Sequence, residues 1–223
     1  MYFYSPLAYV AFAFYFLLNS FFFANDFLYS MIVDVRMIFS NIMFFFLFVI
    51  PLLSMRLVSD EMRHGTDELL LTSPASLTEI VLGKYMASII MLLFMVGFSF
   101  IYPLILSAYG KIDQPVMWLS YLSVFLIGCV MMAVGLFAST LSSHQLVSGI
   151  ISFGILIVLW LLSSLGYSMF PKAKDIFEQF SIVLRATDMQ KGVLNLADVL
   201  FYVTLSALFV VLSIQSLGRK RWR

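Results

Sequence analysis

The chain has 223 residues, of which 62% are hydrophobic and only 11% are charged, and its formal net charge at pH 7 is +1. A soluble domain has about 45–50% apolar and about 25% charged residues, so this chain cannot cover a water-facing surface and must fold with the bilayer as its solvent. A net charge so close to zero gives no reason to expect nucleic acid as a partner. Cys129 is the single cysteine, and His64 and His144 lie far apart in the sequence, so no His/Cys cluster has the spacing of a metal site.

The pattern of apolar runs predicts an all-α integral membrane protein, with one transmembrane domain over residues 1–223. A spanning helix needs about 20 mostly apolar residues, and the chain has six such runs. In chain order, the predicted spans are roughly residues 3–24, 37–55, 84–106, 116–140, 146–170 and 199–217. The first run lacks the basic region and cleavage pattern of a signal peptide, so we expect it to be a retained span.

A charged block separates the second and third spans, over residues 57–75. Ser59 followed by Asp60 and Glu61 is typical of a helix N-terminus, with the serine hydroxyl as the cap and the acids at the positive end of the helix dipole. Gly65 suits the C-terminal cap of the same helix. The block therefore predicts a short helix between Ser59 and Gly65.

A second short segment follows, and Thr66 is expected to cap it before Pro74 ends it. Residues Ser76–Glu79 then form a capping-box pattern that opens the helix leading into the third span. Helices of two turns are not stable alone in water, so the block must lie against another part of the molecule or a partner. A solvated loop with no partner is the alternative.

Three other features qualify as candidate sites or packing positions. Asn19 and Asn41 lie in the first two spans, where a polar amide is expected to hydrogen-bond across helices; a substrate contact is the alternative. Small residues recur four positions apart in spans four and five, which predicts close helix packing. The pairs are Gly135 and Ser139, Ala138 and Ser142, and Ser148 and Ser152. The polar stretch 171–198 is expected to form short external helices or to bind a partner outside the membrane.

Lys and Arg residues set the orientation of a membrane protein, but here the two predicted sides of the membrane carry nearly equal numbers of them. With both termini in the cytoplasm, the inner side holds Arg56, Arg63, Lys84, Arg219, Lys220, Arg221 and Arg223. The outer side then holds Arg36, Lys111, Lys172, Lys174, Arg185 and Lys191. The compact basic tail favours a cytoplasmic C-terminus, because anionic lipids line that leaflet.

The charged block also carries a family resemblance. It reads SDEMRHGTDELLLTSP over residues 59–74, and EIVLGK follows over residues 79–84. This pattern resembles the ABC-2 family of ABC transporter permeases, most closely the branch of the gliding-motility permease GldF and the NosY-type permeases. Two further parts of the sequence resemble the family. Its opening segment is similar to YFYSPLAY at 2–9, and its segment before span six is similar to FEQF at 177–180 and KGVLNLADVLFY at 191–202. The family's usual N-terminal elbow helix is not in this sequence.

The resemblance implies a six-span permease of the type V exporter class in the bacterial inner membrane, with both termini cytoplasmic. It also implies a second permease chain, identical or different, and two copies of an ABC ATPase subunit. ATP and Mg²⁺ would be bound by that ATPase, because this chain has no G-x-x-x-x-G-K-[ST] phosphate-binding motif; we expect no cofactor and no enzymatic activity in the chain itself. Membrane lipid and a periplasmic or large membrane accessory subunit are further expected partners.

The same resemblance implies that the block is the coupling helix, which sits in a cleft of the ATPase. Glu61 would be the acid of the family's E-x-x-x-G-T pattern. The implied coupling residues are Ser59, Asp60, Glu61, Met62, Arg63, His64, Gly65 and Thr66.

Two other functions stay open at this point. A permease-like subunit of a cytochrome c maturation complex, or of another membrane assembly complex, would have similar length and span number. An intramembrane protease is disfavoured, because the chain has no G-x-S-x-G motif, and Ser142, Ser143 and His144 adjoin only in sequence. The substrate is not identified, since no charged residue lies in the middle of any predicted span.

Overall fold

The computed structural model describes residues 6–30, 34–65, 76–169 and 179–221, and the regular structure within these ranges is helical. The prediction of an all-helical protein with six membrane-spanning helices is confirmed, because six helical segments are long and apolar enough to cross a bilayer. The helices are α1 (Pro6–Ser30), α2 (Val35–Ser54), α3 (Ser59–His64), α5 (Leu77–Phe98), α6 (Ile101–Tyr109), α7 (Gln114–Leu141), α8 (Gln145–Met169), α10 (Ile182–Gln190) and α11 (Leu196–Arg221).

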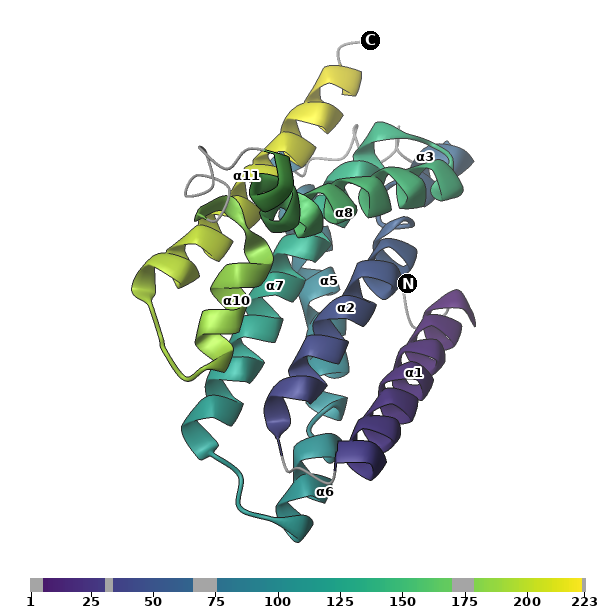
Figure 1. The fold of residues 1–223 in the computed structure, drawn as a ribbon. Helices are drawn as coiled ribbons and strands as arrows, with labels where there is room; N and C mark the ends of the chain where they lie inside the picture. The colour runs from purple at the N-terminus through teal and green to yellow at the C-terminus, as the bar shows by residue number, and fades with distance from the viewer. Residues whose placement is uncertain (1–5, 31–33, 66–75, 170–178, 222–223) are drawn as a thin grey trace.

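Helix α7 is the centre of the bundle, and α2, α5, α8, α10 and α11 pack around it (Figure 1). In the most apolar 18-residue window of α7, 78% of the residues are buried, whereas only 17% are buried in the corresponding windows of α1 and α8. Helix α1 lies at the edge and packs on α2 through aromatic pairs such as Tyr15 and Phe46, whose ring centroids are 5.7 Å apart. Below, the α3 end of the bundle is the end that holds α3 and the C-terminus of α11, and the α6 end is the opposite one (Figure 1).

The third predicted span is longer than expected and is broken. It begins at Leu77, seven residues before the predicted start, because the predicted capping box at Ser76–Glu79 is confirmed: Ser76 accepts from the Glu79 N–H, and the Glu79 carboxylate accepts from the Ser76 N–H. The break at Ser99 and Phe100 separates α5 from α6. Pro103 has no N–H to donate to the Ser99 carbonyl, and the Tyr102 N–H donates to that carbonyl instead, at 3.1 Å.

Helices α2 and α7 approach closely at Gly135, one of the small residues predicted to allow tight packing. A Cβ at this position would lie 2.0 Å from the Ser54 Oγ and 2.4 Å from the Ser54 Cβ, so only glycine fits without a shift of the helices. This contact holds the end of α2 against α7 one helical turn before Ser139.

The stretch predicted to form short external helices contributes helix α10, which packs against α7. Ile182, Ala186 and Met189 of α10 are buried. The Gln190 side chain contacts the Met43 sulfur of α2, at 3.8 Å. The last three residues of the stretch, 196–198, already belong to α11, and residues 170–178 lie outside the described ranges.

Candidate functional site

Helix α3 is the short helix predicted from the charged block, but its N-terminal cap differs from the prediction. Val58 occupies the N-cap position and makes no side-chain cap, and Ser59 is the first helical residue. The prediction that the Ser59 hydroxyl caps the helix is therefore wrong. That hydroxyl is buried and donates to the carbonyl of Met55, one turn earlier in the chain.

The missing cap is supplied by Ser139, which lies 80 residues away on α7. Its hydroxyl oxygen accepts from the N–H groups of Val58 and Ser59, at 2.9 and 3.0 Å. The same hydroxyl donates to the Met55 carbonyl, at 3.1 Å. Since the first N–H groups of a helix have no partner within it, one buried serine on α7 satisfies the start of α3 and attaches it to the central helix.

A second attachment joins α3 to the first residue of α8. The Gln145 amide nitrogen donates to the Asp60 carboxylate, and the Gln145 amide oxygen accepts from the Arg56 Nε at 3.1 Å. The amide thus lies between an acid and a base that flank the start of α3. Asp60 belongs to the charged block and Arg56 directly precedes it, whereas Gln145 follows the α7–α8 turn.

A third attachment joins α3 to α5. The Lys84 ammonium donates to the Glu61 carboxylate and to the Leu57 carbonyl, at 2.5 and 2.6 Å. The Lys84 and Glu61 side chains are only 17% and 28% exposed, so this ion pair is partly shielded from water and salt. Helix α3 is therefore attached to three separate spans, α5, α7 and α8.

The C-terminal part of α3 faces outward. Arg63, His64 and Gly65 are exposed, whereas Met62 packs against the core. The predicted C-cap at Gly65 is confirmed: its φ of 67° lies in the left-handed region, and its N–H contacts the carbonyls of Glu61 and Met62. Thr66 and the second predicted helix lie outside the described residues.

The two asparagines predicted to bond across helices differ from each other. Asn41 of α2 donates to the Asp26 carboxylate of α1 at 2.8 Å, so its interhelical contact is confirmed. The buried Asn19 amide instead donates to the Tyr15 carbonyl of its own helix, at 2.9 Å. The interhelical prediction for Asn19 is wrong, because a carbonyl one turn earlier satisfies the amide locally.

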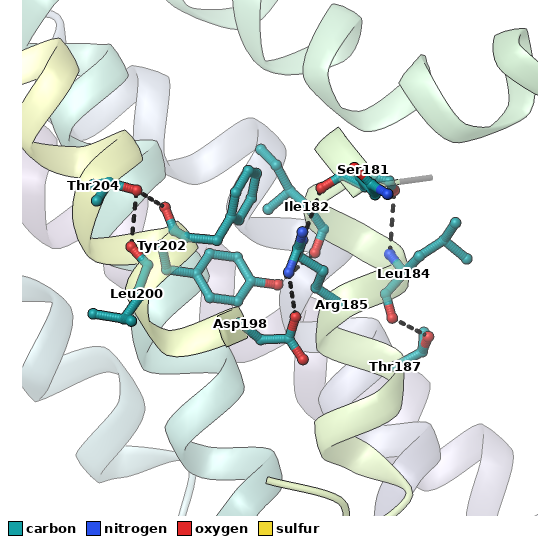
Figure 2. A network of polar contacts seen from close by, with 11 residues as sticks. Ser181, Ile182, Leu184, Arg185, Thr187, Asp198, Leu200, Tyr202 and Thr204 are labelled. Carbon is teal, nitrogen blue, oxygen red and sulfur yellow. Dashed lines mark hydrogen bonds and ion pairs between the residues drawn. The ribbon is translucent and has the colours of Figure 1, made fainter. Parts of the chain in front are cut away.

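A second polar network joins α10 to α11 (Figure 2). The Arg185 guanidinium pairs with the Asp198 carboxylate, whose side chain is 8% exposed, and lies 4.4 Å from the centroid of the Phe201 ring. The Tyr202 hydroxyl donates to the Ile182 carbonyl at 2.6 Å. The ion pair and this hydrogen bond hold α10 against the start of α11.

The residues that attach α3 to the spans were mostly absent from the sequence-based site. From the sequence, Ser139 is predicted only to be a small packing residue, Gln145 is not predicted to belong to the site, and Lys84 belongs to the resembling motif. In the sequence, the one feature that could have indicated these three residues is a polar side chain near the end of a membrane helix. Among the described residues no group of three or more His, Cys, Asp or Glu side chains could hold a metal ion. The attachments to α5, α7 and α8 hold the short helix α3 against the bundle.

Comparison with known proteins gave one match, to a protein family. Residues 4–220 match the family described as ABC-2 family transporter protein, which covers nearly the whole chain. No curated protein and no solved structure matched significantly. The match spans all six membrane helices and the α3 segment between the second and third, and so the chain belongs to the ABC-2 transporter family.

Proposed function

We propose that the chain is the permease subunit of an ABC transporter, and that α3 is the coupling helix through which a separate ATPase subunit moves the membrane spans. ABC-2 permeases normally work with an ABC ATPase partner. In this proposal ATP and Mg²⁺ bind to two copies of that partner, and two permease chains, identical or different, pair in the bacterial inner membrane. The α3 end of the bundle faces the cytoplasm, and the nearest branch is that of GldF and NosY.

The observation that carries the proposal is the three-point attachment of α3. Ser139, Gln145 and Lys84 connect this helix of six residues to α7, α8 and α5. Arg63, His64 and Gly65 remain exposed on its outer part. A helix held in this way transmits a displacement of its outer face to three spans together, whereas a solvated loop would absorb the displacement.

The partner is tested by affinity purification of the chain from its native membrane in mild detergent, followed by mass spectrometry. Recovery of an ABC ATPase is the expected result. Recovery of haem-maturation proteins without an ATPase would favour the assembly-complex function instead.

The coupling role is tested in the purified permease–ATPase complex with Gln145→Leu, Glu61→Lys and Gly65→Pro. We expect Gln145→Leu to leave ATPase binding intact and to lower permease-dependent stimulation of ATP hydrolysis several-fold, because α8 is no longer attached to Asp60. His144→Ala is the matched control, since this neighbouring side chain is exposed. Wild-type stimulation in all three variants would show that α3 does not couple the subunits.

A further inference from the structure

Two tyrosine hydroxyls are buried inside the bundle without a hydrogen-bond partner. Tyr15 of α1 is fully buried, and Tyr121 of α7 is 5% exposed. Among the side chains that the structure describes, their hydroxyls are two of three buried polar atoms that make no hydrogen bond; the third, that of Ser152, lies on α8 beside Gly135. Both tyrosines belong to membrane spans, where lipid offers no hydrogen bond, so each hydroxyl needs a partner inside the protein.

The two hydroxyls lie in the same part of the bundle. The Tyr15 hydroxyl is close enough to that of Tyr121 to interact with it electrostatically, but the two are not hydrogen-bonded to each other. The Tyr15 ring stacks on Phe46 of α2, and the Tyr121 ring packs edge-on against Phe39 of α2, with centroids 4.7 Å apart. Since Phe39 and Phe46 lie about two turns apart on one face of α2, both tyrosines pack on the same side of this helix.

A third hydroxyl in this region belongs to the break between α5 and α6. The Tyr121 ring stacks on Phe100, with centroids 4.0 Å apart, and the buried Ser99 precedes Phe100 in the break. The Ser99 hydroxyl donates to the Val96 carbonyl at 2.6 Å, which leaves its oxygen able to accept. It lies beside the Tyr121 hydroxyl, but the two do not meet the geometry of a direct hydrogen bond.

A water molecule is the ligand that suits these three hydroxyls. An internal water makes about three hydrogen bonds to polar groups that are otherwise unsatisfied, and it commonly bridges polar groups that are too far apart for a direct bond. Each tyrosine hydroxyl can donate or accept, so one water can bond to all three groups. The protein covers both tyrosines, and therefore a lipid headgroup does not reach them.

We propose that an ordered water binds inside the bundle and bridges the hydroxyls of Tyr15, Tyr121 and Ser99. This water attaches α1, which packs on α2 at the edge of the bundle, to the central helix α7 and to the break in the third span. The proposal is independent of the role of α3, because Tyr121 lies about 27 Å along α7 from Ser139.

The test is thermal unfolding in detergent of Tyr15→Phe, Tyr121→Phe and the double variant. Each change removes one oxygen atom and keeps the ring, so the sign of its effect separates a bridged hydroxyl from an unsatisfied one. Loss of a bridging water should lower the melting temperature by about 2 °C or more, whereas removal of a hydroxyl that has no partner should raise it. Since both variants break the same bridge, the double variant should cost less than the sum of the two single variants. Tyr29→Phe is the matched control, because Tyr29 is 85% exposed at the end of α1, and its melting temperature should equal that of the wild type.

A second measurement does not depend on stability. An electron cryomicroscopy structure of the wild-type chain in nanodiscs, at a resolution that shows ordered waters, should show a water within about 3.2 Å of the Tyr15 and Tyr121 hydroxyls. The same water should be lost in Tyr15→Phe. A raised melting temperature in either single variant, a direct hydrogen bond between the two tyrosines, or no water at this site while other internal waters are visible would overturn the proposal.

Discussion

Ser139 is the residue on which the position of α3 depends most directly. Ser139→Ala removes the acceptor of two buried N–H groups, those of Val58 and Ser59. Leaving buried donors unsatisfied costs about 1–3 kcal/mol each, so we expect a clear loss of stability in a thermal unfolding assay in detergent. Ser107→Ala is the control, because the exposed Ser107 hydroxyl bonds only within its own helix. Equal melting temperatures for the two variants would contradict the capping role.

Gly135 is the residue that sets the distance between α2 and α7. Gly135→Ala places a methyl group within 2.4 Å of both side-chain atoms of Ser54, and such overpacking typically costs about 1–3 kcal/mol. Ser54→Gly removes both of these atoms, so the double variant should recover most of the lost stability, measured by the same unfolding assay. Gly154→Ala is the control, since nothing lies within 4 Å of its Cβ. Failure of Ser54→Gly to rescue would place the clash elsewhere.

At the scale of elements, α10 is held on α11 by a largely buried ion pair. Arg185→Met or Asp198→Leu alone leaves one buried charge without its partner, which costs about 3–5 kcal/mol, whereas the double variant should cost much less. Unfolding of the single and double variants measures the coupling directly.

The chain offers a matched exposed pair in the same segment. Lys191 and Asp188 are 64% and 58% exposed, so Lys191→Met should cost less than about 1 kcal/mol. If Lys191→Met destabilised the chain as much as Arg185→Met, burial would not explain the contribution of the Arg185–Asp198 ion pair to stability.

At the scale of the whole molecule, the proposed orientation predicts which end of the bundle faces the cytoplasm. In a Cys129→Ala background, His64→Cys and Lys111→Cys place single thiols on exposed residues near the α3 end and the α6 end. A membrane-impermeant maleimide should label Lys111→Cys in intact cells, and His64→Cys only after permeabilisation. The reverse pattern would invert the topology and would remove α3 from the reach of a cytoplasmic ATPase.

The sequence by itself determined the features that depend on composition or on neighbours within four residues. The apolar runs are long enough only for membrane helices, so the six spans could be predicted. The Gly65 cap and the Ser76–Glu79 capping box involve only local backbone groups, and both predictions are confirmed. Asn19 shows the limit of this reasoning, because its amide donates to the Tyr15 carbonyl of its own helix and not across helices as predicted.

Only the tertiary structure decided which side chains meet at α3. Ser139 and Gln145 reach Val58, Ser59 and Asp60 across 80 residues or more of sequence, and their contacts depend on how α7 and α8 are rotated about their axes. Between helices in lipid there is little hydrophobic pattern to reveal that rotation; close packing decides it, here through the contact of Gly135 with Ser54. The position of α10 likewise depends on distant contacts, because the Arg185–Asp198 ion pair and the Tyr202 hydroxyl attach it to α11.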